Sequence, residues 1–373
     1  MQLGKSKEYK GELNMTDYDY IVVGAGLYGA TFARLKYLQG YKVLVVDNRE
    51  LLGGNCATEK IEGITVHKYG AHIFHTNDEA VWSFVNQFCA MKPYVSNVKA
   101  YNQGKMYSLP FNMNTFYELW GVTTIDAAKL KIKRQQGHYE NPKNLYEQAI
   151  NLVGDDIFET LIKDYTEKQW GKKCSELPPD IIKRLPLRFE WNNNYFNDKY
   201  QAIPEEGYSV MVERMLRPID HITAEWKDVK DKLSYKKLVY TGAIDDYFDY
   251  CFGRLQYRSL TFNTIVKDSE SFQGTAVINY TGKTAYTRSI EHKYFLNEKS
   301  DKTVVTIEYP KQYEDGDERY YPMTDDINLA LYNQYAKLAK DDPNLHFGGR
   351  LGTYKYMNMD QVIAQAMKDV EVF

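Results

Sequence analysis

Three glycines and one acid near the amino terminus have the spacing of a dinucleotide-binding loop. Gly24, Gly26 and Gly29 form the pattern GxGxxG after an apolar run, and Asp47 ends the next apolar run. In such a loop the first glycine allows a tight turn, the second lets the backbone approach a pyrophosphate, and the third lets helix and strand pack closely. The helix that follows directs its free N–H groups toward the phosphates. Asp47 is placed to accept hydrogen bonds from ribose hydroxyls.

A second glycine pair indicates which dinucleotide is bound. Residues 53–55 read Gly-Gly-Asn, shortly after the acid. In flavoproteins with two-dinucleotide folds, small residues at this place let the chain pass close to the phosphates of the flavin; the alternative is an ordinary surface turn. Near the carboxyl end, Gly349 and Arg350 follow a short strand-like run and precede a predicted helix start at residues 359–367. Such an element can return to the cofactor, so the combination favours FAD over NAD.

Aromatic and basic side chains gather in several further segments. They are residues 165–171 (YTEKQWG), 181–189, 192–196, 286–293, 319–322 and 354–356. Aromatic rings beside hydrogen-bonding groups suit a nucleobase, and arginines suit a diphosphate because the guanidinium fork binds two phosphate oxygens at once. For any one arginine the alternative is a solvated salt bridge, and for Trp170 it is packing in the core.

Composition excludes several classes of protein. The 373 residues are 43% hydrophobic and 26% charged, which is ordinary for a globular chain long enough for two or three packed units. The net charge of −3 argues against nucleic acid or an anionic membrane as the main partner. Four scattered cysteines without CxxC spacing indicate free thiols in a reducing compartment, and neither a metal site nor a disulfide framework. We therefore expect a cytoplasmic protein whose residues 1–15 are a disordered extension and not a signal peptide.

The elements that must position these residues follow from the apolar pattern. The predicted strands cover residues 20–23, 42–46 and 237–240, and residues 254–279 and 303–309 are rich in β-structure. The predicted helices cover residues 124–136, 144–153 and 210–216, and residues 155–165 continue in helical style. A helix cap is expected near residues 113–116, and a short helix is expected from Pro178-Pro179 through Arg184.

The predicted fold class is α/β, with a discontinuous Rossmann-like FAD-binding domain, a helical insertion domain and an antiparallel β-sheet domain. The FAD-binding domain is assigned to residues 16–95, 203–248 and 340–373. The helical domain, with a mobile lid, is assigned to residues 112–182. The sheet domain is assigned to residues 96–111, 183–202 and 249–339.

These residues together match a known family. The chain resembles prokaryotic UDP-galactopyranose mutase over nearly its whole length, from about Thr16. The matching blocks are VGAGLYGATFA, LLGGN, HKYGAHIFHT, LPFNMNTF, YTEKQWG, IIKRLPLRF, NNNYF, YTGAIDDYFDY, YTRSIEHK, TVVTIEYP and FGGRLGTYKYMNMDQVI. Several blocks are long and peculiar to that family, so they identify it more specifically than the glycine loop does.

The resemblance implies a flavin-dependent, redox-neutral isomerase. It would interconvert UDP-galactopyranose and UDP-galactofuranose through a covalent adduct between the sugar and N5 of FAD. The FAD must be reduced, and NADPH or NADH is the expected reductant. The expected partner is a UDP-galactose-type nucleotide sugar, and the expected assembly is a homodimer. The product would feed the synthesis of cell-surface polysaccharide.

The resemblance also assigns roles to residues. Two arginines clamp the diphosphate, one of them on the lid, and two histidines lie in the loop facing the flavin: Arg184 (on the lid), Arg288, His72 and His75. The substrate-binding residues are Tyr165, which stacks on uridine, with Thr166, Trp170, Tyr195, Asn279, Tyr320, Tyr321 and Tyr356. The cofactor-binding residues are Gly24, Gly26, Gly29, Asp47, Gly54, Asn55, Gly349, Arg350 and Met359. For either histidine the alternative is a purely structural role.

Two positions depart from the family pattern. Asn358 stands where the family usually has an acid, so a role that needs charge at this place is in doubt. Asp47 replaces the more usual Glu, a shorter side chain that we expect to be tolerated.

Three alternatives stay open at this point. The sugar could carry an N-acetyl group, which would make the enzyme a UDP-N-acetylgalactopyranose mutase or a dual-specificity mutase. An amine-oxidase-like flavin oxidoreductase shares the glycine loop and the Gly-Gly-Asn turn, and it would consume oxygen or NAD(P)H in step with product. A non-catalytic flavin or nucleotide-sugar binding protein would show no ring contraction.

Overall fold

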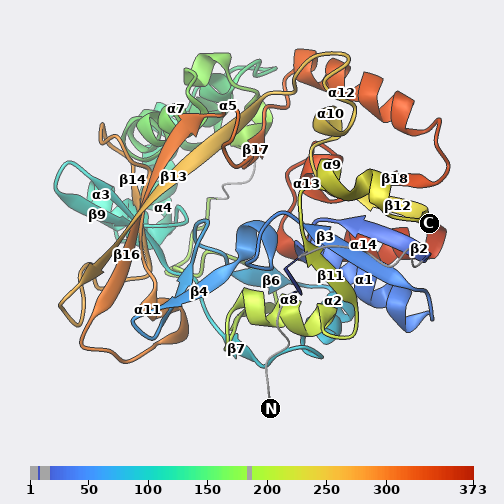
Figure 1. The fold of residues 1–373 in the computed structure, drawn as a ribbon. Helices are drawn as coiled ribbons and strands as arrows, with labels where there is room; N and C mark the ends of the chain where they lie inside the picture. Colours follow the sequence, from blue (N-terminus) through green and yellow to red (C-terminus); the bar gives the residue numbers. More distant parts are fainter. Residues whose placement is uncertain (1–6, 9–16, 183–186) are drawn as a thin grey trace.

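A six-stranded parallel sheet forms one side of the molecule (Figure 1). The computed structural model describes residues 7–8, 17–182 and 187–373. The strands lie in the order β1-β11-β3-β2-β12-β18, and each neighbouring pair is parallel. Their bounds are β1 (Lys7–Glu8), β2 (Tyr18–Val23), β3 (Val43–Asp47), β11 (Asp220–Thr223), β12 (Tyr235–Tyr240) and β18 (Leu345–Phe347).

This sheet confirms the predicted Rossmann-like fold and its discontinuity, because its strands come from widely separated parts of the chain. The predicted strands over residues 20–23, 42–46 and 237–240 coincide with β2, β3 and β12. β1 lies at the sheet edge beside β11. The disordered extension expected over residues 1–15 otherwise falls on residues 1–6 and 9–16, which lie outside the described residues.

Alternation along β2 explains why helices cover both faces of the sheet. Val22 packs into the cluster that contains α1 (Leu27–Leu38), α8 (Tyr208–Leu216) and α14 (Met359–Val372). Ile21 points to the other face, in a cluster with Val229 of α9 (Trp226–Val229). A parallel sheet whose strands are apolar on both faces needs such double cover.

The second large sheet has seven strands in the order β17-β13-β16-β15-β14-β8-β9. Their bounds are β8 (Val98–Asn102), β9 (Lys105–Ser108), β13 (Tyr257–Lys267), β14 (Val277–Tyr280), β15 (Arg288–Glu291), β16 (Thr303–Gln312) and β17 (Tyr321–Pro322). The prediction of a purely antiparallel sheet is wrong at one place, because β8 pairs with β14 in parallel. These two strands are far apart in the chain, so no hairpin imposes an antiparallel direction on them.

Helices pack beside this second sheet (Figure 1). They are α3 (Met113–Trp120), α4 (Ile125–Gln135), α5 (Leu145–Val153), α6 (Asp155–Ile157), the π-helical turn η2 (Phe158–Ile162) and α7 (Lys163–Trp170). Thr124 and Asn144 cap α4 and α5 through their side-chain oxygens, which confirms both predicted starts. The first cap is Asn112, one residue before the expected segment.

Residues 155–165 differ from a single α-helix. The π-helical turn η2 separates α6 from α7, and the hydroxyl of Thr281 donates to the carbonyl of Thr160 at 2.9 Å. The side chain of Thr281, directly after β14, thus satisfies a carbonyl of the turn. The helix expected to run from Pro178 through Arg184 is a short 3₁₀ turn, η4 (Pro179–Ile181), and residues 183–184 lie outside the described residues.

Smaller elements connect the two sheets. β6 (Phe74–Thr76), β10 (Tyr200–Pro204) and β7 (Met91–Pro93) form a three-stranded antiparallel sheet, and β4 (Thr58–Ile61) pairs with β5 (Ile64–His67). The other helices are α2 (Glu79–Val85), α10 (Ile244–Tyr247), α11 (Lys293–Leu296), α12 (Asp326–Ala339) and α13 (Gly349–Gly352). The remaining 3₁₀ turns are η1 (Gly54–Cys56), η3 (Cys174–Glu176) and η5 (Lys230–Lys232).

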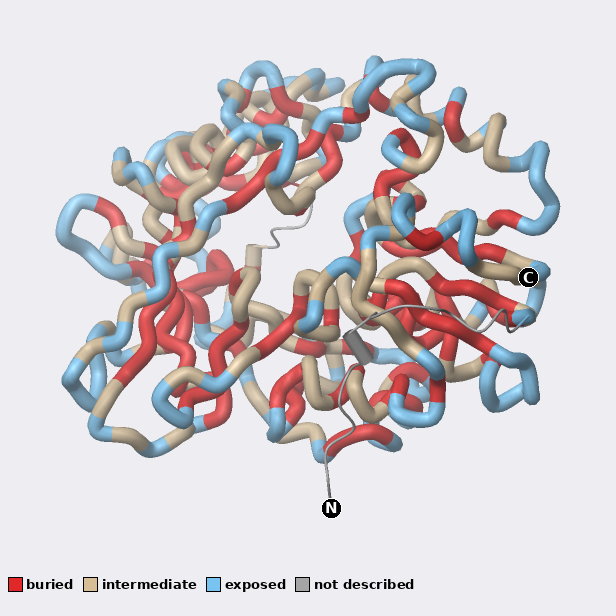
Figure 2. The backbone as a smooth tube through the Cα atoms, in the orientation of Figure 1, coloured by how far each residue is buried: buried red, intermediate tan, exposed pale blue. Residues whose placement is uncertain are grey.

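One hydrophobic cluster runs through most of the molecule. It joins side chains of the parallel sheet, the second sheet and the helical part, and Figure 2 shows buried backbone along both sheets with exposed loops outside. The four cysteines, all within the described residues, are free thiols. Over residues 7–8, 17–182 and 187–373, no helix has the length and apolar character needed to cross a membrane.

Candidate functional site

The glycine loop lies at the carboxyl end of β2, and close contacts require its glycines. Gly24 has a φ of +104°, and a Cβ there would lie 1.9 Å from Oγ1 of Thr241. A Cβ on Gly29 would lie 1.9 Å from the carbonyl oxygen of Gly24. Among the described residues, a Cβ on Gly26 would meet only Cα of Gly54, at 3.9 Å. The first and third glycines are therefore needed by the fold, whereas the second leaves open space for a ligand.

The second glycine pair packs against this loop and is not an ordinary surface turn. The N–H of Gly53 donates to the carbonyl of Ala25 at 3.0 Å, and Gly26 and Gly53 form a β-bridge. Gly53 and Gly54 have φ values of +115° and +58°, in the left-handed region that glycine adopts readily. A Cβ on Gly54 would lie 3.1 Å from Cα of Gly26, so the two glycine segments touch through their backbones.

Asp47 joins the end of β3 to the glycine loop. Its carboxylate accepts the N–H of Ala25 at 2.5 Å and the N–H of Arg49 at 2.8 Å. Burial raises the pKa of Asp47, while these hydrogen bonds act in the opposite direction. The acid predicted to bind ribose therefore also holds the loop in place.

A cavity of about 600 Å³ opens at these loops. All nine predicted cofactor-binding residues line it: Gly24, Gly26, Gly29, Asp47, Gly54, Asn55, Gly349, Arg350 and Met359. The volume is within the roughly 300–1,000 Å³ of typical ligand sites. The amino terminus of α1 adjoins the cavity through Gly26 and Leu27, where free N–H groups favour phosphate.

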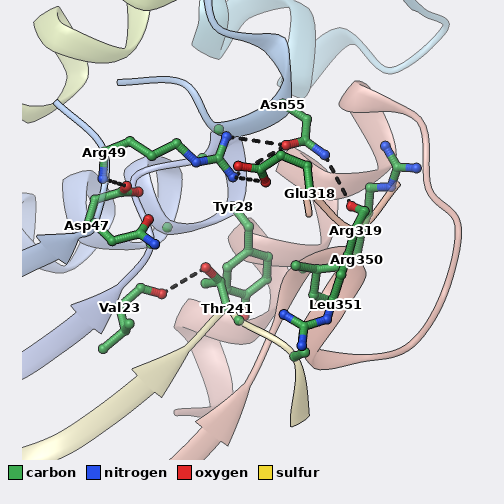
Figure 3. A pocket seen from close by; sticks show the side chains of 18 of the residues that line it. Val23, Tyr28, Asp47, Arg49, Asn55, Thr241, Glu318, Arg319, Arg350 and Leu351 are labelled. Atoms are coloured by element: carbon green, nitrogen blue, oxygen red, sulfur yellow. Dashed lines mark hydrogen bonds and ion pairs between the residues drawn. The ribbon is translucent and has the colours of Figure 1, made fainter. Parts of the chain in front are cut away.

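Charged side chains from distant segments close one wall of this cavity (Figure 3). Arg49 Nη2 lies 2.9 Å from a carboxylate oxygen of Glu318, and the guanidinium donates to Oδ1 of Asn55 at 3.4–3.5 Å. Asn55 in turn donates to the carbonyl of Arg319 at 3.4 Å. The ion pair thus joins the parallel sheet to the loop that follows β16.

A second cavity of about 280 Å³ adjoins the first. Both cavities are lined by Asn55, His72, Arg350, Met357 and Met359. The second cavity is also lined by the predicted site residues His75, Tyr195, Asn279, Arg288, Tyr320, Tyr321 and Tyr356. The residues predicted to bind substrate and those predicted to bind cofactor therefore meet at a common junction.

Three neighbouring strands place a charged row in the second cavity. Asn279 of β14 is the register partner of Arg288 in β15, and Arg288 is the partner of Glu308 in β16. Nε of Arg288 donates to Oδ1 of Asn279 at 3.2 Å, and Nη1 lies 3.4 Å from Oε2 of Glu308. Burial alone would lower the pKa of Arg288, but the adjacent Glu308 carboxylate raises it well above its usual value. The site therefore contains a positively charged guanidinium whose position is fixed by Asn279 and Glu308.

Helix α7 brings the predicted uridine-stacking residue to this row. Nη2 of Arg288 donates to the hydroxyl of Tyr165 at 3.1 Å. The ammonium of Lys168, one turn later, donates to the carbonyls of Tyr280 at 2.8 Å and Gly282 at 2.7 Å. This contact fixes α7 against the β14–β15 hairpin, so Tyr165 and Arg288 stay side by side.

Three tyrosines of the site keep their hydroxyl protons at neutral pH and can donate hydrogen bonds. Burial raises the pKa of Tyr165, Tyr195 and Tyr321. The rings of Tyr321 and Tyr356 stack with centroids 6.0 Å apart. Donors in a partly buried, cationic cavity suit phosphate oxygens.

The two predicted histidines are in different surroundings. Nδ1 of His72 lies 2.7 Å from the carbonyl of Gly70, so this nitrogen carries the proton and Nε2 is an acceptor. Burial lowers the pKa of His72 to about 4. His75 stacks on Phe196 at 3.8 Å, and its Nδ1 lies 2.6 Å from Asp198. His72 adjoins both cavities, whereas His75 lines only the second among the described residues.

Four of the predicted site residues lie either outside the described part of the chain or outside the lining of both cavities. Arg184, which the resemblance puts on the lid, lies outside the described residues. Among the described residues, the lining of neither cavity includes Tyr165, Thr166 or Trp170. Trp170 nevertheless lies 6.2 Å from the ring of Tyr321, and Thr166 is buried on the same helix.

Sequence reasoning missed several residues of the site. Glu308 carried a usable signal, because an acid within the β-rich run TVVTIEYP alternates onto the buried face with Val304 and Thr306. For Thr241, Arg49 and Glu318 the sequence offered no usable signal, because the contacts that place them join distant parts of the chain. Thr241 donates to the carbonyl of Val23, and Arg49 pairs with Glu318.

Three buried neutral histidines predict that stability falls in mild acid. Burial lowers the pKa of His67, of His72 to about 4 and of His292 to about 3. These values lie below the ordinary 6.5, so the unfolded chain takes up protons first as the pH falls. The stabilisation is complete above pH 6.5 and is lost as the pH falls toward 4. Between pH 7 and 5.5 we expect a loss of about 1 kcal/mol per histidine in the free energy of unfolding, measured by urea titration.

Variants locate the source of this pH dependence. His292→Gln should reduce its slope, whereas His138→Gln, at an exposed position, should leave the slope unchanged. An unfolding free energy that is constant from pH 7 to 5.5 would contradict the prediction.

Comparison with known proteins agrees with this geometry. The family model for UDP-galactopyranose mutase matches residues 160–356, and a model for NAD(P)-binding Rossmann-like domains matches residues 22–88. A probable UDP-galactopyranose mutase of Klebsiella pneumoniae is 38% identical over 96% of this chain and 95% of its own length. The dTDP-fucopyranose mutase of Escherichia coli is 36% identical over 95% of this chain and 97% of its own length.

Solved structures show the same fold at low sequence identity. A crystal structure of reduced UDP-galactopyranose mutase aligns with a TM-score of 0.74 at 14% identity, over 95% of this chain and 93% of that one. A putrescine oxidase aligns with a TM-score of 0.57 at 11% identity, over 96% of this chain and 99% of that one. The second likeness shows the shared fold of a wider group of proteins and does not discriminate between reactions.

Proposed function

We propose, because this chain belongs to the UDP-galactopyranose mutase family, that it interconverts UDP-galactopyranose and UDP-galactofuranose. Membership makes the chain a flavin-dependent pyranose–furanose mutase of nucleotide sugars, which is an isomerase. Among nucleotide sugars, we propose that UDP-galactose is the preferred substrate. The family model that carries this name covers the part of the chain that contains Tyr165, Arg288 and Glu308.

The first cavity fits FAD. Open space faces Gly26, where a Cβ would project, and the amino terminus of α1 lies beside it. Gly24, Gly26, Gly54 and Asn55 would hold the pyrophosphate, and Asp47 would face the adenosine ribose. Arg350, Gly349 and Met359 would lie at the flavin end, because Arg350 and Met359 adjoin both cavities. Reduced FAD, when bound, supplies a nucleophilic N5 for the anomeric carbon and leaves the reaction without net redox change.

The observation that carries the proposal is the charged guanidinium of Arg288 beside the junction of the two cavities. Arg288 would bind the diphosphate and stabilise the negative charge that develops on it as it leaves the anomeric carbon. Tyr195, Tyr321 and Tyr356 would donate hydrogen bonds to phosphate oxygens. Arg184 would add a second positive charge from the chain segment outside the described residues.

The remaining site residues orient the substrate. Tyr165, Thr166 and Trp170 would form the uridine side of the site, near Arg288 and Tyr321. Asn279 and Tyr320 would complete the wall of the second cavity. Nε2 of His72 is an unprotonated acceptor at the junction, where it can hold a hydroxyl proton of the sugar. His75 is fixed by Asp198 and contributes to the shape of the cavity.

Product analysis of reduced and oxidised enzyme tests this function. Protein loaded with FAD and reduced by dithionite is incubated with UDP-galactofuranose, and the products are separated by anion-exchange chromatography. We expect UDP-galactopyranose from reduced enzyme only, with no NAD(P)H consumed per turnover. Full turnover by oxidised enzyme, or reductant use in step with product, would overturn the proposal.

Parallel incubations with other nucleotide sugars test which sugar and which nucleobase the enzyme prefers. dTDP-fucopyranose tests the activity named for the Escherichia coli relative, and UDP-N-acetylgalactosamine tests the N-acetyl alternative. We expect kcat/KM to be highest for UDP-galactose. A higher value for either other nucleotide sugar would replace the substrate within the same reaction class.

The proposal also includes a reductant and an assembly. NADPH or NADH would reduce the bound FAD, which anaerobic bleaching of flavin absorbance measures. The chain would form a homodimer, which light scattering after size exclusion measures; a mass of one chain would contradict this part.

A further inference from the structure

The backbone N–H and carbonyl of His72, which belong to the two successive peptide groups on either side of its Cα and are together called the His72 peptide, are each held by a buried side chain. The N–H of His72 donates to Nδ1 of His67 at 3.1 Å. The hydroxyl of Tyr208 donates to the carbonyl of His72 at 3.1 Å. His67 ends β5 and Tyr208 begins α8, and both side chains are fully buried. The two contacts therefore hold both backbone polar groups of His72, through two different elements.

The hydrogen bond to Nδ1 defines the tautomer of His67, whose buried Nε2 has no partner among the described residues. Because Nδ1 accepts an N–H, it carries no proton, and the neutral ring carries its proton on Nε2. The ring stacks on Phe295 at 4.5 Å, with 15° between the planes. The N–H of His67 donates to Nδ1 of His292 at 3.2 Å, and Nε2 of His292 lies 2.7 Å from the hydroxyl of Thr306. Hydrogen bonds thus link Thr306 of the second sheet to the ring of His292, that ring to the backbone of His67, and the ring of His67 to the N–H of His72.

The position of the His72 ring depends on this peptide. Gly70 has a φ of +102°, and its carbonyl accepts the proton on Nδ1 of His72 at 2.7 Å, so ring and backbone move together. His72 adjoins both cavities, whereas neither His67 nor Tyr208 is among the described lining residues of either. Losing one of the two contacts would leave a part-buried backbone group of His72 without its partner, a cost that we expect to shift the loop.

We propose that His67 and Tyr208 are positioning residues that hold the His72 peptide at the junction of the two cavities. Their effect on catalysis rests on the proposed function, but their effect on the loop does not. Neither residue lines either cavity in the described part of the chain; each acts by satisfying one backbone polar group of His72.

Two near-isosteric substitutions test the pair. Tyr208→Phe removes only the hydroxyl, and His67→Phe keeps an aromatic ring against Phe295 but removes the acceptor. In hydrogen-exchange mass spectrometry of the FAD-loaded enzyme, we expect exchange in residues 70–76 to rise roughly 5- to 100-fold in each variant. His67→Asn places an amide oxygen near the position of Nδ1 and should restore much of the protection.

Kinetics separate positioning from general destabilisation. We expect each phenylalanine variant to lower kcat about tenfold with KM changed less than about threefold, because neither side chain lines the second cavity, where the diphosphate contacts are proposed. The fold-loss in kcat of the double variant should be smaller than the product of the fold-losses of the two single variants, since both substitutions act on the backbone of His72. Tyr257→Phe is the matched control: its hydroxyl is buried and has no hydrogen-bond partner among the described residues.

The outcomes distinguish this inference from the proposed function. Unchanged exchange in residues 70–76 for both Tyr208→Phe and His67→Phe would overturn it, whatever the enzyme catalyses. Raised exchange throughout the chain, or equal effects in Tyr257→Phe, would also overturn it. If the wild-type enzyme lacks mutase activity, the exchange experiment still tests the two contacts.

Discussion

Replacing Arg288 with alanine is expected to lower kcat/KM by roughly 10²–10³-fold, while FAD stays bound. Arg288 provides a positive charge in the second cavity, held by Asn279 at 3.2 Å and by Glu308 at 3.4 Å. Its removal leaves the carboxylate of Glu308, only 1% exposed, without this cation in the cavity that we propose binds the diphosphate. The measurement is steady-state kinetics of reduced enzyme, with flavin absorbance as the check on loading.

Further variants separate the lost cation from the stranded carboxylate. Glu308→Gln combined with Arg288→Ala should recover thermal stability lost by the single variant but not activity. Arg288→Lys keeps the charge without the fork and should retain more activity than Arg288→Ala. Arg217→Ala, at an exposed arginine, is the control and should behave as wild type. Wild-type kcat/KM in Arg288→Ala would contradict the assignment of this residue.

Two glycine substitutions are expected to have large effects of different kinds. Gly26→Ala should fold with nearly wild-type stability, because its new methyl group meets only Cα of Gly54, at 3.9 Å, among the described residues. The methyl group would instead occupy space that the pyrophosphate needs, so purified protein should carry little FAD. Gly29→Ala places Cβ 1.9 Å from the carbonyl oxygen of Gly24, which forces the backbone to move. We expect that variant to lose several kcal/mol of stability as well as FAD.

Flavin content per chain and thermal unfolding of the apoprotein measure the two effects. The control is Gly274→Ala, because no atom lies within 4 Å of a Cβ there, although its φ of +73° carries a small backbone cost. FAD binding by Gly26→Ala at wild-type affinity would contradict the placement of the pyrophosphate.

Much of the cofactor side could be predicted from the sequence because its contacts are local. Gly24, Gly26 and Gly29 lie within one strand–turn–helix unit, and Asp47 ends the next strand. A short segment with this order of residues has few conformations that bury its apolar side chains and also place its glycines where only glycine fits. The strand and helix positions followed for the same reason, as at the Thr124 and Asn144 caps.

The predictions were wrong where distant segments decide local structure. The parallel pairing of β8 with β14 brings together residues 98–102 and 277–280, and no turn between them indicates its direction. The π-helical turn at Phe158–Ile162 is stabilised by Thr281, which donates to Thr160 across the same interface. In both cases the determining partner lies more than a hundred residues away in the chain.

By itself, the sequence determined the family and the Rossmann-like fold, because short blocks such as the glycine loop carry their signal locally; the roles of the site residues stay predictions. Only the tertiary structure decided how these residues work together. Register across three strands aligns Asn279, Arg288 and Glu308, and the packing of α8 and β5 sets the His72 peptide between two cavities. The physical reason is that charge pairing and polar satisfaction depend on distances of about 3 Å, which neither composition nor spacing along the chain defines.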